Sequence, residues 1–187
     1  IDDVLLDDQS GQEMLKVTRL SAKFDIMPFF KGKISISSVQ LFGFNINLRK
    51  ETPDSPPNFK FVLDAFASKD TVKKENSLDL RINSILIRRG RMSYHVLSEE
   101  ETPGKFNAKH IQLQNIIANI SLKALSKDSL NLGIKRLSLD EKASGFSLKK
   151  MSLKLVANNK QTNIDNFTIE LPETSLKLDT IHLEYDS

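Results

Sequence analysis

The sequence contains no cysteine, no long apolar run and no large excess of charge of one sign. Without cysteine the chain has no disulfide framework and no thiolate metal site, and the redox compartment stays open. No stretch reaches the about 18 apolar residues of a membrane-spanning helix, and no basic-then-apolar signal sequence begins the chain. The net charge of +3 comes without the clustered Lys/Arg stripe of nucleic-acid-binding proteins, so we expect a well-solvated surface and no nucleic-acid partner.

Side chains that could converge on a catalytic centre are also sparse. The three histidines, His95, His110 and His182, lie in separate segments, and none has a metal-ligand neighbour at a useful spacing. Ser147-x-x-Lys150 matches a short nucleophile motif, but that motif works when a helix places the lysine beside the hydroxyl. Here the two residues lie in a segment that alternates like a strand, so the match predicts no nucleophile.

The acidic residues and the glycines indicate no site either. The pairs Asp7-Asp8 and Asp140-Glu141 are interpreted as solvated strand ends. No glycine-rich loop precedes a helix, so the chain has no candidate for a phosphate cradle. We therefore expect a protein that is not an enzyme and that has no cofactor and no metal ion.

What the sequence does contain is one spacing pattern that repeats: apolar, any residue, apolar, two mostly polar residues, apolar, any residue, apolar. Clear copies occupy residues 34–41, 80–87, 106–113, 132–139, 146–153 and 176–183, and weaker copies occupy residues 15–22 and 162–169. Alternation of this kind is the signature of a β-strand with one buried face. The repeat predicts one extended sheet with one apolar face.

The polar pair at the centre of each copy reverses the phase of the alternation, and two structures would explain it. A two-residue hairpin would keep all four apolar side chains on one face, but such turns strongly favour glycine or Asn-Gly. None of the clear pairs contains glycine. A β-bulge does the same without glycine, because two successive residues oppose one on the partner strand and the strand bends. We favour the bulge, and aligned bulges would curl the sheet around its apolar face.

Two stretches depart from the strand pattern. Residues Phe59, Val62, Leu63 and Phe66 have the spacing of a short amphipathic helix near residues 59–67. Asn58 is the expected N-cap, directly after two prolines. Residues 25–32 are too apolar for a free loop and are expected to plug one end of the sheet. The predicted fold class is therefore mainly β: a curved, bulged antiparallel sheet with one or two short helices in the N-terminal half.

Loops are expected at residues 51–57, 68–77 and 98–105, which are rich in proline or charge. The third of these is the predicted boundary between two units. Residues 1–97 would form an N-terminal β unit that contains the short helix, and residues 98–187 a second β unit that continues the same sheet.

The order and spacing of these elements resemble a known family. The N-terminal part resembles the beginning of AsmA-like and TamB-like proteins of Gram-negative envelopes. The similar segments there are residues 15–17, 25–32, 34–41 and 44–48, a proline-rich loop, the helix at 58–66, and residues 80–94 with a glycine turn at Gly90. The C-terminal half, around Ser144-Gly145-Phe146, resembles the longer TamB-type proteins of Bacteroidetes.

The resemblance implies a taco-like sheet, or β-groove, with an apolar inner surface along its length. Members of this family, the translocation and assembly module among them, are held at the inner membrane and project through the periplasm. They are implicated in moving phospholipid to the outer membrane and in outer-membrane protein assembly, and bridge-like lipid transfer proteins share the architecture. The sequence begins with Ile1 rather than Met, and we expect a fragment of such a protein, with its membrane anchor in a segment absent here.

Under this interpretation the partners are phospholipid acyl chains and an outer-membrane assembly protein. Burying a CH₂ group yields about 0.8 kcal/mol without any directional requirement, which suits a sliding acyl chain. The residues expected to line the lipid groove are Ile34, Ile36, Val39, Leu41, Leu80, Ile82, Ile85, Ile87, Ile111, Leu113, Met151, Leu153, Ile181 and Leu183.

Two alternatives remain open at this point. The same aliphatic residues could form a dry core between two packed sheets or beneath the short helix. The protein could also be a non-catalytic periplasmic scaffold that binds protein partners by pairing at a strand edge. An apolar face that is continuous and open to solvent would favour lipid, and two closed sheets with an uncharged free edge would favour a protein partner.

Overall fold

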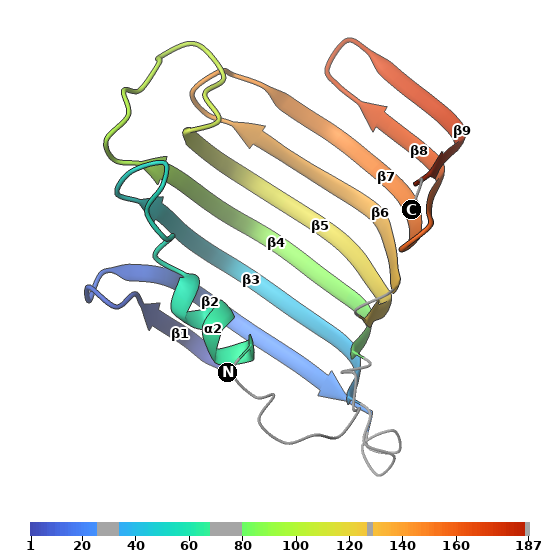
Figure 1. Cartoon of the computed structure of the whole chain (residues 1–187), viewed down its shortest axis with the longest axis horizontal. Helices are drawn as coiled ribbons and strands as arrows, with labels where there is room; N and C mark the ends of the chain where they lie inside the picture. The colour runs from blue at the N-terminus through green and yellow to red at the C-terminus, as the bar shows by residue number, and fades with distance from the viewer. Residues whose placement is uncertain (26–33, 68–79, 127–128, 186–187) are drawn as a thin grey trace.

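A computed structural model describes residues 1–25, 34–67, 80–126 and 129–185, and these form one sheet of nine strands (Figure 1). The strands lie side by side in chain order, from β1 at one edge to β9 at the other. Their bounds are β1 Asp2–Asp7, β2 Glu13–Phe24, β3 Ile34–Lys50, β4 Leu80–Val96, β5 His110–Ser126, β6 Ser129–Glu141, β7 Ser147–Asn158, β8 Gln161–Glu170 and β9 Ser175–Glu184. The prediction of a mainly β chain is confirmed.

Neighbouring strands are antiparallel with one exception. Strands β3 and β4 run parallel, with Ile36 beside Ile82 and Leu48 beside Tyr94. A parallel pair needs a crossover connection because both strands run in the same direction. The crossover contains the helix α2, Lys60–Ala67. The expectation of a wholly antiparallel sheet is therefore wrong at this pair, whereas the expected short helix is present.

Most of the polar pairs are β-bulges, as predicted. Asn83-Ser84 of β4 lies opposite the single residue Ser121 of β5. Lys135-Arg136 of β6 lies opposite a single residue on each side, Asn119 of β5 and Ser152 of β7. Two residues against one is the defining feature of a bulge. The sheet therefore keeps its apolar side chains on one face although the alternation reverses.

Two of the six clear copies of the pattern have other structures. Residues 107–110 form a tight turn in which the His110 amide donates to the Asn107 carbonyl over 3.0 Å, and Phe106 is 63% exposed. Asp179-Thr180 of β9 lies opposite Asp165-Asn166 of β8 without a shift in register. Asn166 has a positive φ of 53°, a conformation that asparagine tolerates better than most residues.

The core is small and lies on one face of the sheet. Val17, Phe44 and Ile116 form its buried centre, and partly buried side chains from β1 to β6 pack around them. The buried apolar residues among those described are Met14, Val17, Phe44, Val96, Ile116, Ala118 and Leu148. With one sheet in the described part of the chain, the alternative of a dry core between two packed sheets is not what these residues form.

The remaining expectations concern single segments. Asn58 precedes α2 but does not cap it, because its Oδ1 accepts from the Arg49 amide over 3.0 Å. The expected plug at residues 25–32 lies, apart from residue 25, outside the described residues. The expected boundary at residues 98–105 lies in the connection between β4 and β5, which pair directly, so both proposed units share one sheet. The one helix among the described residues is too short to cross a bilayer.

Candidate functional site

The apolar face carries aliphatic rows that cross the sheet from strand to strand. Residues directly opposite one another on paired strands have their side chains on the same face, so the register defines the rows. The first row runs through Phe24, Ile36, Ile82, Leu122, Leu132, Leu155, Ile164 and Ile181. The second row runs through Leu20, Leu41, Ile87, Ala118, Leu137, Met151, Ile169 and Leu176. Each row crosses eight strands, β2 to β9, and contains no polar residue.

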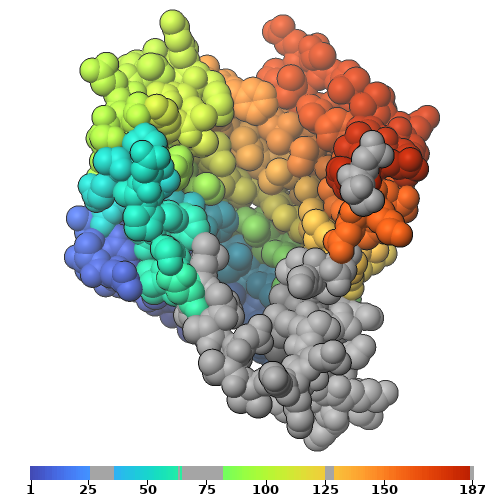
Figure 2. Space-filling view, in the orientation of Figure 1, coloured from blue at the N-terminus to red at the C-terminus, as the bar shows by residue number. Residues whose placement is uncertain are grey.

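A third, shorter row lies between these two. It runs through Ala22, Val39, Ile85, Ile120, Ile134 and Leu153 on strands β2 to β7. In the part of the chain that the structure describes, no second sheet covers these rows. Figure 2 shows this face hollowed over the central strands, with α2 at one side and β8 and β9 at the other.

The predicted groove residues whose side chains are described belong to this face and remain partly open to solvent. Leu183 is 47% exposed, and the others are of intermediate burial. Ile34 and Leu80 lie in paired strands, but their side chains are outside the described set. Ile111 and Leu113 lie beside the rows, near the end of β5, where Leu113 packs against the buried core.

The prediction named nine of the 22 residues in the three rows. Leu122, Leu132, Leu155 and Ile164 of the first row were not named as groove residues, although two of them belong to recognised copies of the repeat. The sequence does not give the strand register that aligns these copies, so it could not assign these four residues to a row. The polar residues of the bulges lie on the other face, where Lys135, Arg136 and Lys149 are exposed as expected.

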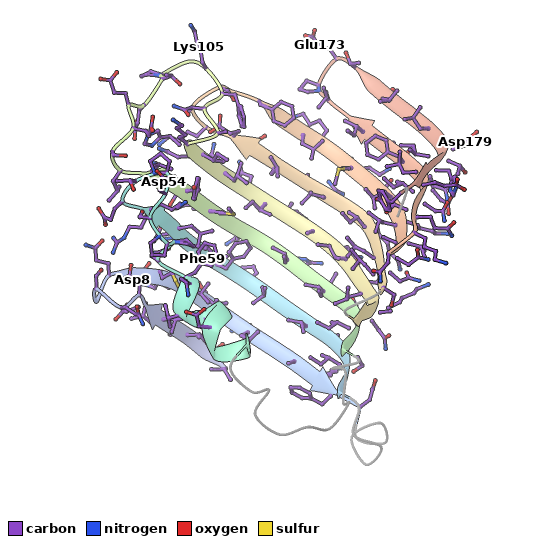
Figure 3. All side chains as sticks on the ribbon, in the orientation of Figure 1. Asp8, Asp54, Phe59, Lys105, Glu173 and Asp179 are labelled. Atoms are coloured by element: carbon purple, nitrogen blue, oxygen red, sulfur yellow. The ribbon has the colours of Figure 1, made fainter. Side chains whose placement is uncertain are left out.

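Buried carboxylates lie at the ends of the strands, where the sequence predicted solvated ones. Asp8 is only 6% exposed, and its Oδ2 lies 2.6 Å from Nη2 of Arg49. Hydrogen bonds from the Ser10 hydroxyl, and further ones from the Gln12 amide and the Asn58 side chain, outweigh the effect of burial and lower the pKa of Asp8 to about 2. Figure 3 labels Asp8 at the turn between β1 and β2.

Glu141 is the second such group and is 3% exposed. Burial alone would raise its pKa, but hydrogen bonds from Ser144 and from the amides of Ala143 and Gln112 outweigh it, so the pKa lies below the ordinary value. The adjacent Asp140 also has a lowered pKa, chiefly because Asn115 and then Ser147 donate to it. These hydrogen bonds hold the turn between β6 and β7 and join it to β5, which indicates that the two carboxylates anchor strand ends.

The Ser147-x-x-Lys150 motif does not assemble. The Ser147 hydroxyl donates to Asp140 Oδ1 over 2.6 Å, and Lys150 Nζ lies 3.4 Å from Glu170 Oε1. Each side chain therefore has its own partner, and no nucleophile is formed between them.

The histidines are arranged differently from the expectation. His95 and His110 lie opposite each other on β4 and β5, with their Nδ1 atoms 3.0 Å apart. Glu101 Oε1 lies 3.9 Å from His95 Nδ1. The expectation that no histidine has a ligand-type neighbour is therefore wrong, because the strand register and the connecting loop bring distant residues together.

Comparisons with protein-family models, curated proteins and solved structures found no match to this chain. The resemblance to AsmA-like and TamB-like proteins therefore rests on the residue pattern described above, and the function that it implies is a proposal.

Proposed function

We propose that the chain is part of a periplasm-spanning AsmA/TamB-like protein whose apolar β-groove carries phospholipid between the inner and outer membranes. In this proposal the protein is held at the inner membrane by a segment outside the present sequence and supports outer-membrane biogenesis. The observation that carries the proposal is the pair of apolar rows that cross strands β2 to β9 without a polar residue.

The rows have the dimensions that an acyl chain needs. Strands are spaced about 4.8 Å apart, so a row across eight strands is about 34 Å long. One acyl chain occupies about half of a hydrocarbon core of about 30 Å, which corresponds to three or four strands. A chain that advances by one strand meets an equivalent set of aliphatic side chains, so its free energy changes little along the path.

The bulges support a sheet that curls around these rows. A bulge bends its strand and increases the local twist, and bulges recur in β4, β6 and β7, each displaced along the strands relative to the one before. We infer that the repeated bend gives the taco-like curvature of the family. The charged residues of the bulges would then lie on the convex side, away from the lipid.

Native mass spectrometry with lipid extraction, on protein purified from a bacterial host, tests the proposal. Co-purified phospholipid in a defined ratio is the expected result. A clean protein mass, with no gain after incubation with phosphatidylethanolamine and phosphatidylglycerol vesicles, would contradict lipid binding by this part of the protein.

A photo-crosslinking pair locates the lipid. A benzophenone amino acid replaces either Leu155, in the first row, or Lys154, which is exposed on the other face. Phospholipid adducts are expected at position 155 and not at position 154. Equal labelling at the two positions would show that lipid is not held on the apolar face.

The alternative is a periplasmic scaffold that binds a protein strand at the edge of the sheet. Strand β9 is one edge, and Leu176, Leu178 and Leu183 are 48%, 40% and 47% exposed there. Between them stand charged residues such as Lys177 and Asp179, the latter labelled in Figure 3, and charged residues discourage edge pairing. Protein crosslinks at β9 from a preparation without lipid would favour this alternative.

A further inference from the structure

The strand register brings two histidines and a glutamate together at one end of β4 and β5. His95 and His110 face each other across the strands, and the connecting loop, with Lys105 labelled in Figure 3, returns Glu101 to the same place. One ligand-type atom from each of His95, His110 and Glu101 lies within 4.8 Å of the other two. The paired strands and the loop between them therefore direct three ligand-type atoms at one point.

A backbone hydrogen bond fixes the protonation of His110. Its Nε2 lies 2.8 Å from the carbonyl oxygen of Glu99. A carbonyl oxygen only accepts, so Nε2 carries the proton and the neutral ring presents the lone pair of Nδ1. That lone pair is directed at His95 Nδ1, 3.0 Å away. A histidine whose second nitrogen donates to a backbone carbonyl is the usual arrangement of a metal-bound imidazole.

The loop that carries the glutamates is held in place, and the point of convergence is open to solvent on one side. The Leu97 amide donates to the Lys50 carbonyl over 2.9 Å, and Lys109 Nζ lies 2.6 Å from Glu99 Oε2. His110 is 7% exposed, whereas the Glu101 side chain is 63% exposed. The two imidazoles are therefore preorganised, and Glu101 lies where an ion would enter.

We propose that His95, His110 and Glu101 bind a divalent transition-metal ion, with water in the remaining position. Zinc takes imidazole at about 2.0–2.1 Å in a tetrahedron, which places neighbouring ligand atoms about 3.3 Å apart. The observed separations of 3.0 Å and 3.9 Å lie on either side of that value. Imidazole ligands favour zinc, nickel or copper over calcium or magnesium, which take oxygen ligands.

Calorimetric titration of the untagged, metal-stripped protein with Zn²⁺ tests the site. One ion per chain is expected, with affinity at least about tenfold lower in His95→Gln and in Glu101→Gln. Because Glu101 is exposed, Glu101→Gln is expected to keep its fold, and circular dichroism checks this. His182→Gln is the matched control, because His182 Nε2 lies 3.0 Å from Glu184 Oε1 in an exposed pair without a second histidine; its affinity should be unchanged.

A second readout uses Co²⁺, whose visible absorption reports four-coordinate nitrogen and oxygen ligation. The wild-type protein and His182→Gln should give this spectrum, and His95→Gln should not. Absence of Zn²⁺ binding, or binding equal in wild type, His95→Gln and Glu101→Gln, would overturn the proposal. The lipid experiments are independent of this result, since the cluster and the apolar rows involve different residues.

Discussion

Buried carboxylates join the β1–β2 turn and the β6–β7 turn to neighbouring strands, and hydrogen bonds that the fold supplies stabilise each of them in its charged form. Asp8 accepts from Ser10, Gln12, Asn58 and Arg49. Arg49 is at the end of β3, and Asn58 precedes α2, so one carboxylate connects three segments. Removing it leaves buried donors without an acceptor, which costs more than the hydrogen bonds themselves contribute.

Asp8→Asn is therefore expected to lower the free energy of unfolding by about 2 kcal/mol at neutral pH. The pKa of about 2 in the folded protein lies below the ordinary aspartate value of 3.8. The stabilisation is thus complete above about pH 4 and is lost as the pH falls towards 2. Urea unfolding at pH 7 and at pH 2.5 measures this, and the difference between wild type and variant should shrink at the lower pH.

The control for this change is Asp64→Asn, which removes an exposed ion pair with Lys60 on α2. Such pairs contribute about 0.3–0.5 kcal/mol. If Asp8→Asn cost no more than Asp64→Asn, the anchoring role of Asp8 would be wrong.

Gly90 allows the closest approach in the core. A Cβ at this position would overlap the ring of Phe44 and lie 3.0 Å from Cβ of Ile116. Gly90→Ala is expected to destabilise the protein by about 1–3 kcal/mol, the usual cost of overpacking. In a Phe44→Leu background the added methyl group has more space, so the cost of the alanine should fall. An equal cost in both backgrounds, measured by denaturant unfolding, would contradict the contact.

At the scale of the element, each bulge keeps the apolar side chains on both sides of it on the same face of the sheet. Deleting Lys135 leaves Leu132, Ile134, Leu137 and Leu139 in simple alternation, so these side chains keep their face and β6 loses its bulge. Deleting Ser138 instead makes Leu137 and Leu139 adjacent, so Leu139 turns away from the core cluster that it contacts. In thermal unfolding we expect the Lys135 deletion to keep a cooperative transition and the Ser138 deletion to lose it. Equal loss in the two deletion variants would refute the role of the bulge.

Substitutions on the two faces of the sheet should differ in their effect on stability. Leu113 packs against the buried centre of the core, so Leu113→Asp is expected to cost about 2–4 kcal/mol by burying a carboxylate without a partner. Lys149→Ala removes an exposed side chain from a bulge and should change stability by less than about 0.5 kcal/mol. Comparable losses for the two variants in thermal unfolding would mean that the faces are assigned wrongly.

Local pattern was sufficient to predict most of the strands and bulges, because both depend on residues next to each other in the chain. The parallel pairing of β3 and β4 was not predictable in this way, since it depends on the direction in which the chain returns after α2. The same limit applies to the polar clusters. Asp8 and Arg49 are 41 positions apart, and His95 meets His110 only because of the register of β4 and β5.

At the scale of the whole molecule, the described residues form one layer whose stability should decrease towards its edges. Nine of the ten residues of β9 are exposed and one is intermediate, and β1 has five exposed residues of six. Each of these strands has one neighbour in the sheet, whereas β4 and β5 lie between paired strands and contribute Val96, Ile116 and Ala118 to the buried set. Edge strands with few buried contacts open at a smaller free-energy cost than central ones.

Hydrogen exchange measured by mass spectrometry should therefore show amides of β1 and β9 exchanging at least about 100-fold faster than those of β4 and β5. Uniform protection across the sheet would contradict a single open layer.

The same measurement with phosphatidylethanolamine and phosphatidylglycerol vesicles tests lipid binding, because acyl chains along the rows would cover Leu176 and Ile181 at the β9 end. Protection should then increase in β7 to β9 and remain constant in β4 and β5, which are already protected. If the vesicles leave the hydrogen exchange of β9 unchanged, the apolar face is stable in water but does not bind lipid.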